Sequence, residues 1–101
     1  MSVIVVARFA VPDVARALAS LTENGALLEE ISADAKKLGA IHHLFAAGES
    51  EVIVIDEWDK AESFQGFFDG NQKVEKITTD LGVQGPPTVE VFEKGEARGT
   101  F

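Results

Sequence analysis

Four polar residues in the middle of the chain could carry out acid–base chemistry. His42 and His43 are the only histidines, and histidine is the side-chain type that exchanges protons most readily near neutral pH. Asp56 and Glu57 follow an apolar run that is typical of a strand. Because neighbouring residues of a strand point to opposite faces, neither the two histidines nor the two carboxylates can act as a pair on one surface. The acid–base arrangement on offer is therefore one histidine oriented by one carboxylate.

The register of a hairpin decides which histidine shares a face with Asp56. If Ala47 lies opposite Ser50, His43 and Asp56 face the same side, and a shift of one residue would bring His42 there instead. We predict His43 and Asp56 as the catalytic pair, with His43 as the general base. A histidine that is only hydrogen-bonded within the fold is the alternative interpretation.

Aromatic residues near the end of the same strand are candidates for contact with a ligand. Trp58 could stack on a planar molecule or simply fill the core. Phe64 and Phe68 lie four residues apart on one helix face, which favours core packing, with ligand contact as the alternative. Phe67 diverges from its neighbour Phe68 by about 100° and is expected near the surface or a subunit boundary. The predicted ligand-contact residues are Trp58, Phe64, Phe68 and His42.

Composition and charge exclude several classes of protein. The chain has no cysteine, so disulfides and thiolate metal sites are absent, and two histidines that diverge on a strand cannot chelate one metal ion. We expect neither a metal nor a cofactor. The net charge is −8, which is unfavourable for nucleic acid and for anionic membranes. The apolar start is too short to span a bilayer, and we expect a cytoplasmic protein.

Hydrophobic periodicity predicts the elements that must position these residues. The segment Val3–Phe9 is typical of a buried strand, and two apolar stripes after Pro12, separated by Asn24-Gly25, predict a helix in two pieces. The later elements are two strands at Ala40–Ala46 and Glu51–Trp58, a helix capped by Asp59 with Glu62, a further helix ending at Gly82, and a last strand at Thr88–Phe92.

The predicted order of elements is βαββαβ. With right-handed crossovers this order gives an α+β, ferredoxin-like fold with a four-stranded antiparallel sheet and all helices on one face. Residues 1–101 then form one domain, with 94–101 as an arm or a disordered tail. Arg8 is predicted to pair with Glu90 on the neighbouring strand, and binding of a substrate carboxylate by Arg8 is the alternative. The helix-free face would be a large apolar patch, so we expect a homodimer formed through it.

Four segments resemble the antibiotic-biosynthesis-monooxygenase-like branch of the dimeric α/β-barrel superfamily. They are VIVVARFAV (Val3–Val11), LGAIHHLF (Leu38–Phe45), VIVIDEWDKAESF (Val52–Phe64) and GPPTVEVFE (Gly85–Glu93). The resemblance implies a dimeric α/β barrel and places Trp58 beside a pocket between sheet and helices. Members of this branch include cofactor-independent oxygenases of quinol-like polyketides, quinol oxygenases and haem-degrading enzymes. The haem degraders use a histidine from the helix after the tryptophan strand, and KAESFQGFFDGNQKVEKI has none here.

Two functions follow as expectations. The first is a cofactor-independent monooxygenase-like enzyme that acts on a planar aromatic or quinol-like compound. The second is a non-catalytic homodimer that binds a small apolar ligand or serves only assembly. Both use the same residues, so a structure showing whether a histidine and an aspartate meet in one cavity is the observation that bears most directly on the choice.

Overall fold

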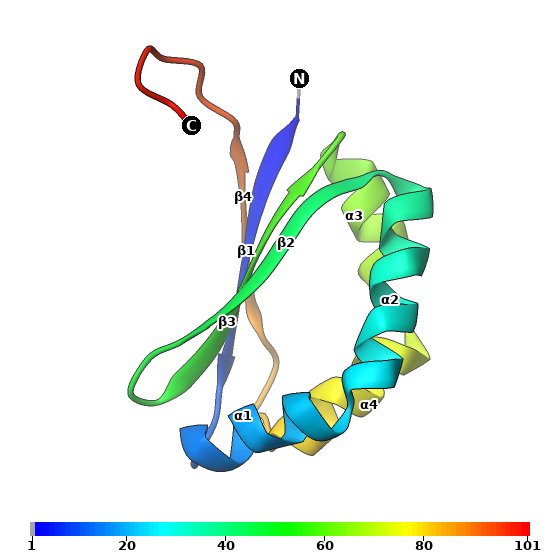
Figure 1. Ribbon diagram of the computed structural model, residues 1–101, viewed down its shortest axis with the longest axis vertical. Coiled ribbons are helices and arrows are strands. Elements are labelled where there is room, and N and C mark those ends of the chain that lie inside the picture. Colours follow the sequence, from blue (N-terminus) through cyan, green and yellow to red (C-terminus); the bar gives the residue numbers. More distant parts are fainter. Residues whose placement is uncertain (1) are drawn as a thin grey trace.

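The computed structural model describes residues 2–101, which form one four-stranded sheet and four helices. Strand β1 is followed by two consecutive helices, a hairpin, two further helices and a last strand (Figure 1). The element bounds are β1(Val3–Ala10), α1(Val14–Glu23), α2(Gly25–Leu38), β2(Ala40–Ala47), β3(Glu51–Trp58), α3(Ala61–Phe68), α4(Gln72–Leu81) and β4(Thr88–Glu93).

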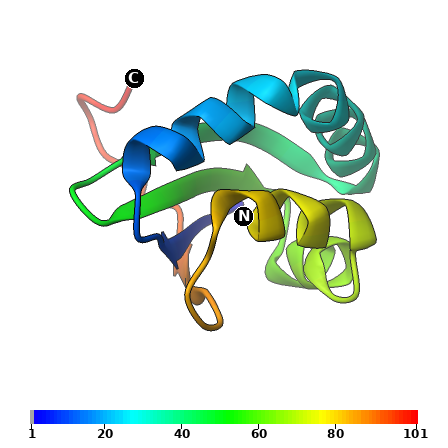
Figure 2. The same ribbon diagram turned by 90° about the horizontal axis from the view of Figure 1, so that it is seen from below.

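The sheet is antiparallel throughout, with the strand order β2-β3-β1-β4. This order places the first and last strands side by side, as the βαββαβ arrangement requires. All helices lie on one side of the sheet (Figure 1), and the arm α1–α2 runs beside the arm α3–α4 (Figure 2). The predicted ferredoxin-like α+β fold is confirmed.

The junction after β3 differs from the prediction at Asp59. Helix α3 begins one residue later, with Lys60 at the N-cap and no side-chain cap. The Asp59 carboxylate instead lies against Gly39, where a Cβ atom would collide with it, and the Asp59 amide donates to the Gly39 carbonyl at 3.0 Å. Gly39 ends α2 with a φ of 123°, a conformation that glycine tolerates and other residues rarely adopt. The end of α2 is thereby fixed to the end of β3.

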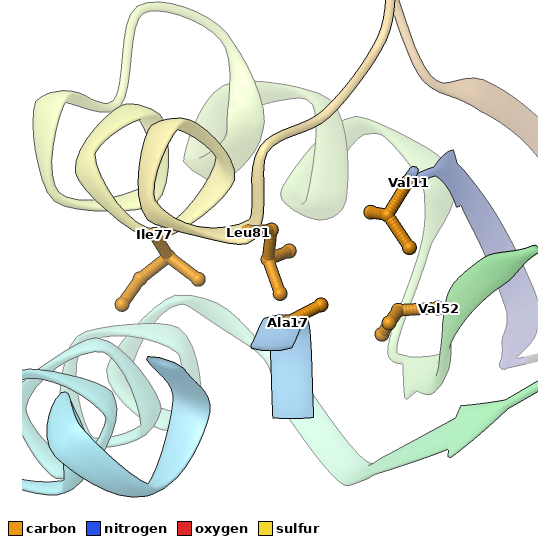
Figure 3. Close-up of a cluster of buried hydrophobic side chains, with 5 residues drawn as sticks. All are labelled: Val11, Ala17, Val52, Ile77 and Leu81. Carbon is orange, nitrogen blue, oxygen red and sulfur yellow. The ribbon is translucent and has the colours of Figure 1, made fainter. Parts of the chain in front are cut away.

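The buried core between sheet and helices is divided into two clusters. One joins strand ends to α1 and α4 and consists of Val11, Ala17, Val52, Ile77 and Leu81 (Figure 3). The other lies at the opposite end of the strands and consists of Val5, Trp58 and Phe64. Burial of such side chains contributes roughly 25 cal/mol per Å² of apolar surface. Two clusters rather than one leave room for a cavity between them.

The helix-free face of the sheet combines apolar and charged side chains. Arg8 donates to Glu51 at 3.1 Å and lies 3.6 Å from Glu90, so the predicted pairing with Glu90 is confirmed and Glu51 shares it. Leu44 is 51% exposed on this face, and Phe92 is 49% exposed.

Among residues 2–101, none of the helices has both the length and the apolar character needed to cross a membrane.

Candidate functional site

A cavity of about 370 Å³ lies between the sheet and the helices. Its walls come from β1, β2 and β3 on one side and from α2, α3 and α4 on the other. Most of the lining side chains are aliphatic or aromatic, and the volume is in the range of small-molecule sites. The polar lining residues are Ser32, Lys36, His42, His43, Asp56 and Thr78. An apolar cavity with a few polar groups suits a ligand that is itself largely apolar.

Asp56 connects two other predicted site residues by hydrogen bonds. His43 Nδ1 lies 2.6 Å from Asp56 Oδ1, and the Trp58 indole Nε1 donates to Asp56 Oδ2 at 3.2 Å. Asp56 and Trp58 are buried, whereas the His43 side chain is 37% exposed. The structure therefore places His43, Asp56 and Trp58 together on the helix-covered face of the sheet.

The contact to Asp56 determines which nitrogen of His43 is available. An ionised Asp56 accepts hydrogen bonds only, so Nδ1 carries the proton and donates it. In the neutral ring Nε2 then has a free lone pair, and within residues 2–101 no hydrogen-bond partner of Nε2 is recorded. A histidine held in this tautomer by a carboxylate can accept a proton from a bound molecule.

A β-bulge at the start of β2 decides the face on which each histidine lies. Ala40 is opposite Trp58, but the pairing shifts before His42, which is opposite Glu57. If Ile41 were paired as an ordinary strand residue, alternation from Ala40 would have turned His42 toward the helices. The register at the other end of the hairpin has Ala47 opposite Val52 rather than Ser50. This is a shift of two residues, which leaves His43 on the face that was predicted.

His42 is hydrogen-bonded on the other side of the sheet. Its Nδ1 lies 3.0 Å from Glu57 Oε1, and Glu57 Oε2 accepts from Ser2 Oγ at 2.6 Å and from Lys94 Nζ at 3.2 Å. The hydrogen bonds from Ser2, His42 and Lys94 lower the pKa of Glu57 to about 2. His42 is nevertheless among the residues that line the cavity. Its ring nitrogen Nδ1 is engaged by Glu57.

The aromatic wall of the cavity includes one residue that the sequence placed elsewhere. Phe67 was expected near the surface or a subunit boundary, but its ring lies 5.3 Å from that of Trp58 and it lines the cavity. Phe67 and Trp58 therefore lie in the same wall of the cavity. Phe64 is buried at 5.8 Å from Trp58, and Phe68 stacks on Phe64 at 5.2 Å, as expected for core packing. Phe64 and Phe68 also line the cavity.

The mouth of the cavity is identified by the exposure of its lining residues. Of the lining set, only Lys36, Ile41, His42 and His43 are exposed. They belong to the last turn of α2 and the first residues of β2, so the cavity opens between this helix and this edge strand. Sequence reasoning did not find Lys36 as a site residue. The signal was present, because Leu28, Ser32 and Lys36 follow one another at intervals of four and share a helix face.

Ion pairs hold the helices over the cavity. Lys73 of α4 lies 2.8 Å from Asp34 and 3.2 Å from Glu30 of α2. The Lys73 ammonium lowers the pKa of Asp34, and the two carboxylates raise the pKa of Lys73. Exposed pairs of this kind contribute little individually, but these join two helices that lie far apart in the sequence.

Comparison with known proteins identifies the fold. No protein-family model matches the sequence, and no curated protein matches it. Solved structures match over nearly the whole chain. A monooxygenase from the gene ActVA-Orf6 of Streptomyces coelicolor, in complex with nanaomycin D, is 15% identical, with a TM-score of 0.71 over 98% of this chain and 93% of that one.

Two further structures have the same fold. A dimeric ferredoxin-like protein from an uncultured marine organism is 15% identical, with a TM-score of 0.67 over 97% of this chain and 93% of that one. A mutant of SnoaB, a cofactor-independent oxygenase from Streptomyces nogalater, is 14% identical, with a TM-score of 0.62 over 98% of both chains. The resemblance to the antibiotic-biosynthesis-monooxygenase-like branch is confirmed at the level of the fold.

Proposed function

We propose that the protein is a cofactor-independent monooxygenase-like enzyme that acts on a planar aromatic or quinol-like compound. The observation that carries the proposal is the contact of His43 with Asp56 at 2.6 Å beside an apolar cavity. In this arrangement His43 is the general base and Asp56 is the carboxylate that orients it. Trp58, Phe64 and Phe68 supply the flat apolar walls, to which the structure adds Phe67.

The chemistry needs only a base, an electron-rich substrate and dioxygen. His43 Nε2 removes a proton from the substrate, and the resulting anion supplies the electrons that reduce oxygen. Addition of dioxygen to a ring carbon gives a peroxide, which takes up the proton from His43. Loss of the remaining hydrogen of that carbon, with cleavage of the O–O bond, gives a carbonyl and water. In sum, a ring methylene and dioxygen give a ring carbonyl and water.

The helix-free face supports the second part of the proposal, a homodimer. Leu44 and Phe92 are about half exposed there, and one of the similar structures is described as a dimeric ferredoxin-like protein. We propose that two copies pack through these faces, with segment 94–101 reaching over the partner. A specific dimer of this kind buries on the order of 1,200 Å² or more in total. Sedimentation equilibrium at micromolar concentration measures this directly, and a stable monomer would contradict it.

The enzymatic proposal is tested by oxygen consumption with anthrone- and naphthol-type substrates. The expected result is turnover by wild-type protein purified free of metal, with one atom of labelled dioxygen in the product. His43→Gln is expected to abolish this turnover, because an amide cannot accept the proton. If the labelled oxygen of the product came from water instead, the oxygenase chemistry would be wrong. Tight ligand binding without any oxygen consumption would favour the non-catalytic dimer.

A further inference from the structure

We propose, on the basis of the proposed function, that the ligand is a planar aromatic hydroxy acid whose anionic group is bound by Lys36 at the mouth of the cavity. Lys36 is the only lysine or arginine among the residues that line the cavity. It belongs to the four exposed lining residues that define the mouth. His43 belongs to the same set, so the cation and the base stand on the two sides of one opening.

Lys36 combines a place in the cavity lining with the lack of a recorded ion pair, whereas the other basic residues without a recorded ion pair, Arg16, Lys37, Lys60 and Arg98, do not line the cavity. Lys73, Lys76 and Lys94 each lie within 3.2 Å of a carboxylate. Across residues 2–101, no ion pair of Lys36 is recorded. Its ammonium group therefore has no internal counter-ion, and a cation beside an apolar cavity favours a ligand with a negative charge.

The charges around the cavity fix the orientation of such a ligand. Asp56 is the only acidic residue that lines the cavity, and it lies deep in the wall, where its negative charge repels an anion. His42 borders the mouth, but Glu57 engages its Nδ1. The anionic group is therefore most stable at Lys36, and the aromatic rings extend inward toward Trp58. A hydroxyl group on the same ring system can then reach His43 from the inner side.

The helix dipole gives the competing explanation for Lys36. Lys36 and Lys37 both lie in the last turn of α2, where basic residues interact favourably with the carbonyl end of a helix. Lys37 does not line this cavity. Replacement of Lys37 therefore controls for the dipole and for net charge, while leaving the mouth intact.

The experiment uses Trp58 fluorescence as the readout. Trp58 is the only tryptophan, the chain has no tyrosine, and the indole lies in the cavity wall, so quenching reports binding at this site. The probes are 1-hydroxy-2-naphthoate and its methyl ester, which differ mainly in the negative charge. Wild-type protein is expected to bind the acid about fivefold more tightly than the ester, and this preference should decrease with added salt.

The variants Lys36→Gln and Lys37→Gln separate the outcomes. The preference for the acid is expected to disappear in Lys36→Gln, to persist in Lys37→Gln and to return in Lys36→Arg. Equal binding of acid and ester by the wild type would overturn the role of Lys36 and leave the cavity as a ligand site. If neither probe quenches the fluorescence of Trp58, this inference is wrong. Oxygen consumption with uncharged naphthols would in that case still support the proposed enzyme. Circular dichroism of each variant checks that it is folded.

Discussion

The chain contains two carboxylate–histidine pairs that are adjacent in sequence and lie on opposite faces of one sheet. Asp56 and His43 meet on the helix-covered face, beside a cavity. Glu57 and His42 meet on the helix-free face. Both pairs join the same two strands, and their contact distances are 2.6 Å and 3.0 Å. The local chemistry is nearly the same, so their surroundings must account for any difference in role.

The surroundings differ in the donors that reach each carboxylate. Glu57 accepts from Ser2 and from the cationic Lys94 as well as from His42, so its negative charge is fully compensated and its pKa falls to about 2. Asp56 has the Trp58 indole as its second donor, which is neutral. A carboxylate with neutral donors retains more capacity to stabilise a positive charge that forms on its histidine. We infer that the inner pair suits proton transfer and that the outer pair suits structure.

The strongest test of this comparison replaces each histidine in turn. His43→Ala is expected to lower kcat/KM for a naphthol-type substrate by about 10²- to 10⁴-fold, because it removes the general base. His42→Ala is the comparison on the same strand and should lower turnover much less than His43→Ala does, since the Nδ1 of His42 is bound to Glu57 on the helix-free face. Equal losses in the two variants would show that the faces do not differ in function.

The next test asks whether the outer face is the site of subunit contact. Leu44→Asp places a charge on the helix-free face and is expected to raise the dimer dissociation constant by about 30-fold or more. Leu38→Asp is the control, because Leu38 is 52% exposed and Leu44 is 51% exposed, but Leu38 lies on α2. Analytical ultracentrifugation measures both variants. A dimer that is weakened by Leu38→Asp and not by Leu44→Asp would place the interface elsewhere.

A smaller effect is expected from removing the second donor of the inner pair. Trp58→Phe keeps an aromatic ring but removes the N–H group that donates to Asp56. The free energy of unfolding should fall by about 1.5–3 kcal/mol, the usual range for a hydrogen bond to a charged group. Phe67→Leu removes an aromatic neighbour of Trp58 without any polar change and is the control in urea unfolding. If the two variants lose the same stability, the hydrogen bond contributes no more than packing.

The smallest effect is expected from acid titration of the outer pair. The pKa of Glu57 is lowered from 4.5 to about 2 in the folded protein, so its ionised form stabilises the fold above about pH 4.5. This contribution is lost as the pH falls from about 4.5 through about 2. In Glu57→Gln the melting temperature should therefore depend less steeply on pH in this window than in the wild type. Glu62→Gln, an exposed change on α3, should leave the slope unaltered.

The features of the fold that depend on the pattern of hydrophobic residues could be predicted from the sequence. The strands, the paired helices and the sheet order follow from apolar periodicity and from turn residues, and they were predicted correctly. Phe67 was misplaced because helix periodicity defines faces but does not say how a short helix packs against a strand end. Asp59 was misplaced because its carboxylate meets Gly39, a contact between segments 20 residues apart that no local motif encodes.

The candidate site was predictable only through the register of one hairpin. His43 was placed correctly with Asp56 because alternation was counted from the turn, and a register shift of two residues leaves that alternation unchanged. Counting from Ala40 would have selected His42, since nothing in the sequence identifies the bulge. Lys36 was missed because it is polar and exposed, and its position at the mouth depends on the distance between α2 and β2. The distance between two elements that only folding brings together cannot be inferred from the type of a single residue.

The bulge at Ile41 also has a consequence for heredity. Loss of its single codon would remove the extra residue of the bulge and leave Ala40, His42 and His43 in one-to-one pairing with Trp58, Glu57 and Asp56. Both histidines would then keep their present faces. A one-residue gap at this position among relatives of the chain is therefore compatible with an unchanged site, whereas a residue lost elsewhere in the strand would reverse the faces of the residues on one side of it.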